Sequence, residues 1–312
     1  MRLHVEGEEF ENVYVFVADA LRFDYVPERA RERGEVVKTA ASGTASPTSF
    51  ATMVTGRYPP QHGVYDFSCR LDDSIPTLYD AFDGVSVPST IGGNVGGVLG
   101  TGVDSGEGSV SDAEPPFVFV ERNLLTHAAY GELFQWDDAE FDSHEEYWNA
   151  RKNDREGMLS DYERGARMAF EVFEERLDTL EDRGLLDDTL AIFTADHGDL
   201  LGEYGLVAHG LLSCPELVYV PTVFANDRVT ARGEFVAQVD FFPTAASVFG
   251  EAEDYADELP GYDLLAGAPD HRLVYNRLKR RARDKFSAWD ASGGHVFQRD
   301  SPVDRCSGGG ER

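Results

Sequence analysis

The sequence of 312 residues is poor in lysine and in positive charge as a whole. It contains 28 Lys and Arg residues against 57 Asp and Glu residues, which gives a net charge of −29 at pH 7. Lysine occurs only at Lys38, Lys152, Lys279 and Lys285. The shortage of positive charge argues against binding to nucleic acid or to an anionic membrane surface, because both need a basic face. A lysine-poor acidic surface favours a halophilic protein, since concentrated salt screens self-repulsion. An ordinary acidic protein is the alternative.

The sequence also lacks long apolar runs, a signal-peptide pattern and a cysteine framework. No run is long enough to cross a bilayer, and the first residues, MRLHVEGEEF, lack the basic-then-apolar order of a secretory signal. The cysteines, Cys69, Cys214 and Cys306, are few and widely spaced, which predicts free thiols. We therefore expect a cytoplasmic protein. No GxGxxG pattern follows the first apolar run, which argues against a dinucleotide-binding fold.

Hydrophobic residues make up 42 % of the chain, and they are organised in short runs separated by helical patterns. Continuous apolar runs predict buried strands at residues 13–18, 117–120, 190–194 and 221–224. An apolar stripe over residues 159–181 predicts a long amphipathic helix. The alternation of strand and helix predicts an α/β fold, with a mostly parallel central sheet and helices on both faces. Ligands of such sheets bind at the carboxyl ends of the strands.

Two of the predicted strands are followed by residues that can bind a metal. Asp19 follows the first strand, and Asp196 and His197 follow the strand at residues 190–194. Carboxylate oxygen and imidazole nitrogen together suit Mg, Mn or Zn and suit Ca less well, and Gly198 permits a close approach of the backbone. A helix N-cap or turn is the alternative for Asp19, and a solvated loop is the alternative for the later pair. His209 follows in the same glycine-rich loop and could contact an anionic substrate.

Residues 44–64 contain small hydroxyl residues at the start of a short apolar helix that ends at Thr55-Gly56. The hydroxyls are those of Ser46, Thr48 and Ser49. A hydroxyl at a helix N-terminus faces free backbone N–H groups and the positive end of the helix dipole. This position suits an alcohol nucleophile and the anion that it attacks. A plain Ser/Thr N-cap is the alternative.

Three stretches, VYVFVADALRFD, ASPTSFATMVTGRYPPQHGV and FTADHGDLLGEYGLVAHG, follow one another in this order. Together they resemble the sulfatase family of the alkaline phosphatase superfamily. The stretches PFVFVERNLLTHAAY, VDFFPTAASVFG and LPGYDLL agree with it, so that the resemblance spans about residues 13–265. It implies an alkaline-phosphatase-like catalytic domain at residues 1–265. Residues 266–306 would form a reduced antiparallel part packed on this domain, and residues 307–312 a disordered tail.

The resemblance also implies a role for individual residues. It matches Asp19, Asp196 and His197 to the metal ligands and Ser46 to the nucleophile, with Thr48 and Ser49 as alternatives if the register shifts. It matches His127 and His209 to positions that hold the oxygens of the transferred group or protonate the leaving oxygen. The expected cofactor is a divalent metal ion, Mn, Mg or Ca in preference to Zn. The expected partner is a small anionic ester.

This sequence departs from the family pattern at three places. Sulfatases make a formylglycine from the first residue of Cys/Ser-x-Pro-x-Arg, but here Thr48 and Phe50 stand at the Pro and Arg positions. Ala20 stands where the family often has a second aspartate. The lysine–histidine pair that the family has near residue 94 is absent, and Asn94 is the polar residue left there. Asn94 is therefore a candidate substrate contact. We therefore predict a metal-dependent hydrolase or transferase with an unmodified serine, which favours phosphate esters. A formylglycine-independent or modified sulfatase and a non-catalytic anion- or partner-binding protein are the alternatives.

Overall fold

The central sheet of the computed structural model has six strands in the order β10-β3-β8-β5-β2-β4. The structure describes residues 1–88, 91–100, 108–130, 141, 143–255, 257–280 and 283–300. The strands are β2 (Asn12–Ala18), β3 (Val36–Ala40), β4 (Val118–Asn123), β5 (Thr189–Thr194), β8 (Tyr219–Phe224) and β10 (Phe235–Ala237). Only β8 runs antiparallel to its neighbours. The predicted α/β class and mostly parallel sheet are therefore confirmed.

Strand β2 is buried along its whole length because each of its faces belongs to a different hydrophobic core. Val13, Val15 and Val17 lie in one core, and Tyr14 and Phe16 lie in the other. This alternation follows from the two-residue repeat of a strand. It explains why the first apolar run of the sequence contains no polar residue.

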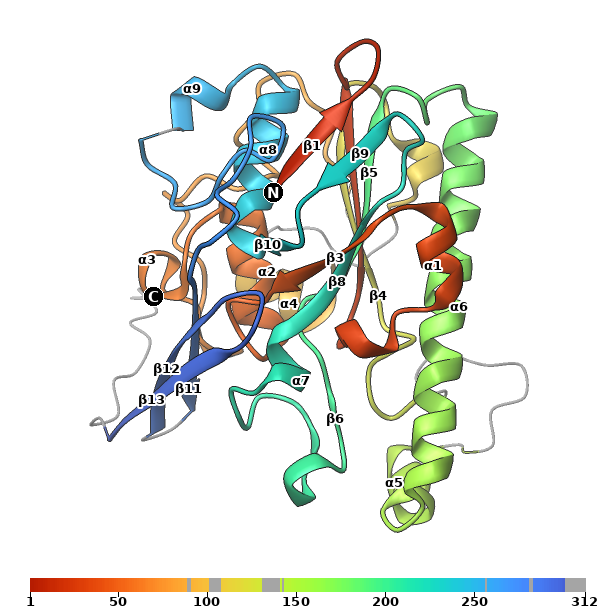
Figure 1. The fold of residues 1–312 in the computed structure, drawn as a ribbon, viewed down its shortest axis with the longest axis vertical. Coiled ribbons are helices and arrows are strands. Elements are labelled where there is room, and N and C mark those ends of the chain that lie inside the picture. The colour runs from red at the N-terminus through yellow and green to blue at the C-terminus, as the bar shows by residue number, and fades with distance from the viewer. Residues whose placement is uncertain are drawn as a thin grey trace, which may run out of the picture.

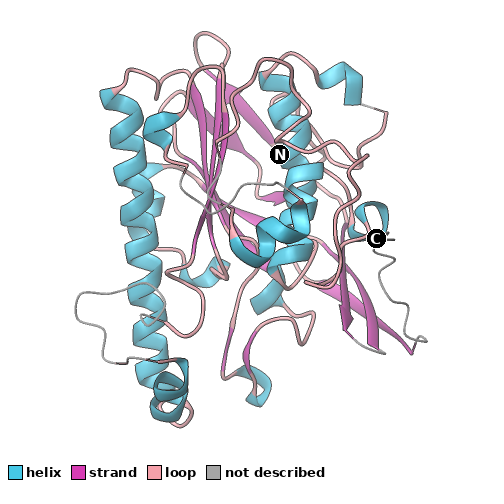
Figure 2. Cartoon of the chain, turned by 180° about the vertical axis from the view of Figure 1, so that it is seen from behind, coloured by secondary structure: helices cyan, strands magenta, loops and turns pink. Residues whose placement is uncertain are grey.

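Helices cover both faces of the sheet (Figures 1 and 2). The long helix α6 (Arg155–Asp182) lies on one side, and α2 (Ser46–Thr55), α4 (Gly93–Leu99) and α8 (Phe241–Val248) lie on the other. Helix α2 ends where predicted, at Gly56, which has a left-handed φ of 63°. The remaining helical segments are η1 (Phe23–Tyr25), α1 (Glu28–Arg33), α3 (Pro59–His62), η2 (Val110–Asp112), α5 (His144–Arg151), η3 (Glu203–Gly205), α7 (Pro215–Val218), η4 (Gln238–Asp240) and α9 (Ala252–Tyr255).

Three smaller sheets surround the central one. Strand β1 (Arg2–Val5) pairs with β9 (Val229–Arg232), and β6 (Leu200–Leu201) pairs with β7 (Val207–Ala208), both antiparallel. At the C-terminal end, β11 (Val274–Arg280), β12 (Arg283–Trp289) and β13 (Gly294–Asp300) form an antiparallel sheet. The expectation of antiparallel C-terminal strands is thus confirmed, although they form a sheet of their own. The domain boundary at residue 265 stays a prediction.

The C-terminal sheet is attached to the segment that leads into α2. The side-chain amide of Asn276 donates a hydrogen bond to the carbonyl of Ala41 (2.9 Å), and the backbone N–H of Arg277 donates to the carbonyl of Ser42 (3.1 Å). Val274 and Trp289 are buried against residues of β8 and β10. These contacts fix the residues that precede α2 against the C-terminal sheet.

Among the described residues, no helix is both long enough and apolar enough to cross a membrane. Cys214 is a free, buried thiol, as expected, and Cys306 lies outside the described residues.

Replacement of Phe173 by alanine should destabilise the fold strongly. Its ring is fully buried and packs against Tyr14, Phe16, Phe170 and Phe193. The resulting cavity should lower the free energy of unfolding by about 3–5 kcal/mol, measured by denaturant titration in molar KCl. Phe67→Ala is the control, because Phe67 is 53 % exposed, and it should change this free energy by about 0.5 kcal/mol or less. Equal losses in the two variants would contradict the described core.

Candidate metal centre

The carboxyl ends of β2 and β5 bring three of the predicted residues together. Asp19 directly follows β2, and Asp196 and His197 follow β5 after one intervening residue. The two strands are parallel neighbours, so their ends meet at one edge of the sheet. One ligand atom from each of the three side chains lies within 4.8 Å of the others, and all three residues are fully buried.

In each of the two carboxylates, one oxygen accepts hydrogen bonds and the other accepts none from the residues that the structure describes. Oδ1 of Asp196 accepts hydrogen bonds from the backbone N–H groups of Ala20 and His197, both at 2.9 Å. Oδ2 of Asp19 accepts from Ser46 and from Arg122. Oδ2 of Asp196 and Oδ1 of Asp19 are buried and accept no hydrogen bond from the described residues. Buried carboxylate oxygens are costly without a partner, so these two atoms fit a divalent cation.

The hydrogen bonding of the His197 ring also suits the binding of a cation. Its Nδ1 lies 2.9 Å from the carbonyl oxygen of Gly198, which favours the tautomer with the proton on Nδ1. Its Nε2 then carries the lone pair and faces Asp196 (3.3 Å) and Ser46 (3.3 Å). The backbone after His197 passes so close to α7 that a Cβ on Gly198 would lie 1.9 Å from the carbonyl oxygen of Glu216. Glycine is therefore required at this position.

Ser46 is the first residue of α2 and not its N-cap. The N-cap is Ala45, which makes no side-chain capping bond, so capping does not explain Ser46. The Ser46 Oγ donates to Oδ2 of Asp19 at 3.2 Å and lies 3.3 Å from Nε2 of His197. Among the described hydrogen bonds, neither Thr48 nor Ser49 reaches these ligands. The geometry therefore favours Ser46 among the three candidate hydroxyls.

Two further predicted histidines lie beside the ligands. The ring centroid of His209 is 4.3 Å from that of His197 and 5.2 Å from that of His127. Nδ1 of His127 is buried and has no hydrogen-bond partner among the described residues. Asn94 is exposed on α4, and the described hydrogen bonds do not connect it to this cluster. Its role as a substrate contact stays a prediction.

His209 is held by a residue that the sequence analysis did not single out. Its Nδ1 lies 3.2 Å from Oδ1 of Asp199, and Oδ2 of Asp199 accepts a hydrogen bond from the Tyr130 hydroxyl at 2.7 Å. Asp199 is fully buried. These two consecutive contacts, from Tyr130 to Asp199 and from Asp199 to His209, fix the ring of His209 beside His197.

The two carboxylates are affected differently by their surroundings. Burial raises the pKa of Asp19, but the positive charge of Arg122 and the neighbouring histidines outweigh it and hold this pKa well below its usual range. Burial and the charge of Asp19 raise the pKa of Asp196 to about 7. Arg122 thus balances one of the two negative charges, and a bound cation would balance the other.

The two histidines near the ligands are also shifted in opposite directions. Burial and the neighbouring His209 lower the pKa of His197 to about 3, so its imidazole is neutral at pH 7. Burial lowers the pKa of His209, but the hydrogen bond to Asp199 and the charge of Asp199 outweigh it and raise this pKa to about 9. A neutral His197 is suited to bind a metal, and a charged His209 is suited to an anion.

Arg122 is the main site residue that sequence reasoning missed. It lies near the end of β4, and its Nε and Nη2 are 2.7 and 2.6 Å from Oδ2 of Asp19. The sequence contained one signal for Arg122: an arginine stands near the end of a buried apolar strand, immediately after Glu121. Buried charges need partners, and this one pairs with the first predicted metal ligand.

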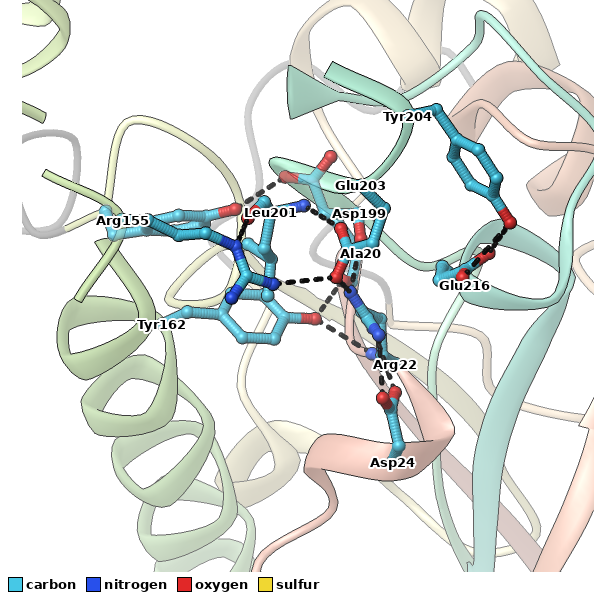
Figure 3. Close-up of polar contacts among 11 residues, drawn as sticks. Ala20, Arg22, Asp24, Arg155, Tyr162, Asp199, Leu201, Glu203, Tyr204 and Glu216 are labelled. Carbon is cyan, nitrogen blue, oxygen red and sulfur yellow. Dashed lines mark hydrogen bonds and ion pairs between the residues drawn. The ribbon is translucent and has the colours of Figure 1, made fainter. Parts of the chain in front are cut away.

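Arg22 and Asp24, which share the motif of Asp19, are structural (Figure 3). The guanidinium of Arg22 donates to Asp24 at 2.6 and 2.8 Å and to Glu203 at 3.0 Å. The hydroxyl of Tyr162, on α6, donates to the carbonyl of Ala20 and accepts from the N–H of Arg22. These bonds fix the turn after Asp19, in which Ala20 has a left-handed φ of 66°.

Comparisons with known proteins identify the family of the chain. The family model described as Sulfatase matches residues 109–251. The low-salt glycan biosynthesis sulfotransferase Agl7 of Haloferax volcanii is 34 % identical, over 97 % of this chain and 79 % of its own. The chain belongs to the sulfatase family.

Solved structures show the same fold at low sequence identity. The 2-O GAG sulfatase BT1596 superposes with a TM-score of 0.73 at 14 % identity, covering 94 % of this chain and 83 % of its own. The phosphonate monoester hydrolase of Agrobacterium radiobacter has a TM-score of 0.60 at 14 % identity, covering 93 % and 89 %. This member of the sulfatase family therefore has the fold of the alkaline phosphatase superfamily, as its motifs implied.

Replacement of Asp196 by alanine should abolish stabilisation by divalent metal. Wild-type protein at a Mn²⁺ concentration 100 times the dissociation constant should gain about 2.7 kcal/mol. The variant loses one of the two open carboxylate oxygens and should gain almost nothing. Thermal unfolding with and without Mn²⁺, together with calorimetric titration, measures this. Asp73→Ala is the control, because the Asp73 side chain is 85 % exposed and pairs with Arg70. Loss of the Mn²⁺ effect in this control would contradict the assigned site.

Proposed function

We propose that this protein transfers a sulfuryl or phosphoryl group from an anionic ester, with unmodified Ser46 as nucleophile and a divalent cation held by Asp19, Asp196 and His197. The observation that carries the proposal is the position of Ser46. Its Oγ lies within hydrogen-bond distance of two of the three ligands and at the N-terminus of a helix. This position suits both a nucleophile and the anion that it attacks.

The cation, Mn, Mg or Ca in preference to Zn, supplies charge that lowers the pKa of the serine hydroxyl and neutralises the ester oxygens when it is bound. Ser46 releases its hydroxyl proton to water, because Asp19, whose pKa lies well below its usual range, is a poor proton acceptor. Ser46 Oγ then forms a bond to sulfur or phosphorus, while the bond from that atom to the ester oxygen breaks. His209 or His127 protonates the departing oxygen. The products of this step are the free alcohol and the group esterified to Ser46.

The second step returns Ser46 to its starting state. The oxygen of water or of an acceptor alcohol bonds to the same sulfur or phosphorus, and the bond to Ser46 Oγ breaks. The histidine that gave up its proton takes one from the incoming hydroxyl, and Ser46 recovers a proton from water. Water as acceptor makes the protein a hydrolase, and an alcohol makes it a transferase.

Two observations favour different transferred groups. The absence of Pro at position 48 and of Arg at position 50 argues against formylglycine, and an unmodified serine favours phosphoryl transfer. The name of Agl7, a sulfotransferase, favours the sulfuryl group and an alcohol acceptor. A formylglycine-independent or modified sulfatase and a non-catalytic anion-binding protein are the other candidates.

Ser46→Ala should lower turnover of the preferred ester by at least about 10³-fold, because loss of a nucleophile removes the covalent path. The substrates are p-nitrophenyl phosphate, its phosphodiester analogue and p-nitrophenyl sulfate, each tested with Mn, Mg, Ca or Zn in molar KCl. Glycerol is added in parallel, and transfer to it would identify an alcohol acceptor. Intact-mass measurement should detect the ester on wild-type Ser46.

Ser49→Ala is the matched control, because it removes another buried hydroxyl of α2, one without a hydrogen-bond partner among the described residues. It should retain turnover. Unchanged turnover in Ser46→Ala would refute the serine mechanism. Sulfate cleavage alone, with a modified Ser46 in the mass spectrum, would favour the modified sulfatase. Metal binding without turnover of any ester would favour the non-catalytic protein.

A further inference from the structure

Glu121 and Arg122 are consecutive residues at the end of β4, and they contact opposite sides of the sheet. Glu121 pairs with Arg176 of α6, at 3.2 Å. Arg122 pairs with Asp19, and its guanidinium lies 5.7 Å from the ring centroid of Phe50 on α2. The two-residue repeat of a strand produces this division. Glu121 therefore belongs to the contact with α6, and Arg122 belongs to the candidate metal centre.

Arg122 and the proposed nucleophile share one acceptor atom. Oδ2 of Asp19 receives both guanidinium nitrogens of Arg122, at 2.7 and 2.6 Å, and the Oγ of Ser46, at 3.2 Å. The permanent positive charge therefore lies next to the atom that would receive the transferred group. The side chain of Arg122 is 14 % exposed, whereas that of Asp19 is fully buried. An anion that enters from solvent can thus reach Arg122.

Arg122 also lies beside a position where the family pattern expects a cation. Phe50 stands four residues after Ser46, at the arginine position of that pattern, and it is fully buried. Helix α2 therefore brings no positive side chain from this position. Strand β4 brings one from a different part of the chain, over the face of the Phe50 ring.

We propose that Arg122 binds the oxygens of the transferred sulfuryl or phosphoryl group and so supplies the positive charge that position 50 lacks. A guanidinium matches the geometry of tetrahedral oxyanions and stays charged at every working pH. Its ion pair with Asp19 fixes its orientation before the substrate arrives. The inference rests on the proposed function for the identity of the group, but binding of the anion can be measured without turnover.

Arg122→Gln should weaken the binding of inorganic sulfate and inorganic phosphate to the Mn²⁺-loaded protein. Loss of charged hydrogen bonds should raise the dissociation constant of the better-bound anion by about 10- to 100-fold. Arg122→Lys keeps the charge but loses the planar fork, so its dissociation constant should lie between those of wild type and Arg122→Gln. Calorimetric titration of the full-length protein in molar KCl, with Mn²⁺ present, measures these constants.

Arg176→Gln is the matched control, since it removes an arginine–carboxylate pair from the opposite side of the same strand. It should bind the anion as wild type does. Mn²⁺ affinity and the unfolding temperature are measured for every variant. We expect Arg122→Gln to bind Mn²⁺ at least as tightly as wild type, because Asp19 loses a competing cation.

The outcomes separate the inference from the proposed function. Wild-type anion affinity in Arg122→Gln would overturn the inference, as would the binding of neither anion by the wild type. Joint loss of Mn²⁺ binding and thermal stability in Arg122→Gln and Arg122→Lys would show a structural role and would also overturn it. A selective loss of anion binding, in a protein whose wild type turns over no ester, would support Arg122 as an anion-binding residue and contradict the proposed transfer reaction.

Discussion

The site depends on the buried carboxylate of Asp19 and on how its two oxygens are used. A buried charge is costly unless opposite charge or hydrogen bonds compensate it. Arg122 and Ser46 compensate Oδ2, whereas Oδ1 has no hydrogen bond among the described residues. Asp196 repeats the pattern with two backbone donors on one oxygen. One ligand atom each from Asp19, Asp196 and His197 lies within 4.8 Å of the others, so these side chains could hold one cation next to Ser46.

The surrounding fold is adapted to this arrangement. Asp19 can reach Asp196 because β2 and β5 are parallel neighbours that end at the same edge. The chain must then turn sharply, and Ala20 takes a left-handed conformation that is unfavourable for a residue with a Cβ. The hydrogen bonds of Tyr162 to both sides of this turn compensate the strain. In this way α6, far away in sequence, stabilises the backbone of the metal centre.

The pattern of residues in the sequence predicted those parts of the structure that depend on local sequence. The apolar runs predicted β2, β4, β5 and β8 because strands buried on both faces must be continuously apolar. The residues that follow β2 and β5 lie together and form the candidate metal centre. The antiparallel direction of β8 could not be predicted, since an apolar run fits a strand of either direction. Strand β3 was missed because it is short and contains Lys38, whose charge reaches the carbonyl of Ala291. Arg122 was missed because its partner, Asp19, is more than 100 residues away in sequence.

The charge of the whole protein and the charge of the site act over different distances. A net charge of −29 repels an anionic ester at long range. In molar salt, however, the screening length falls to about 3 Å, so this repulsion affects the approach of the substrate very little. Contacts within the site are close to that length and are buried, so they are screened much less. A strongly acidic member of this family can therefore bind an anion, provided that its few cations are concentrated at the site. Under the proposed function, Arg122, His209 and the bound metal ion meet this requirement.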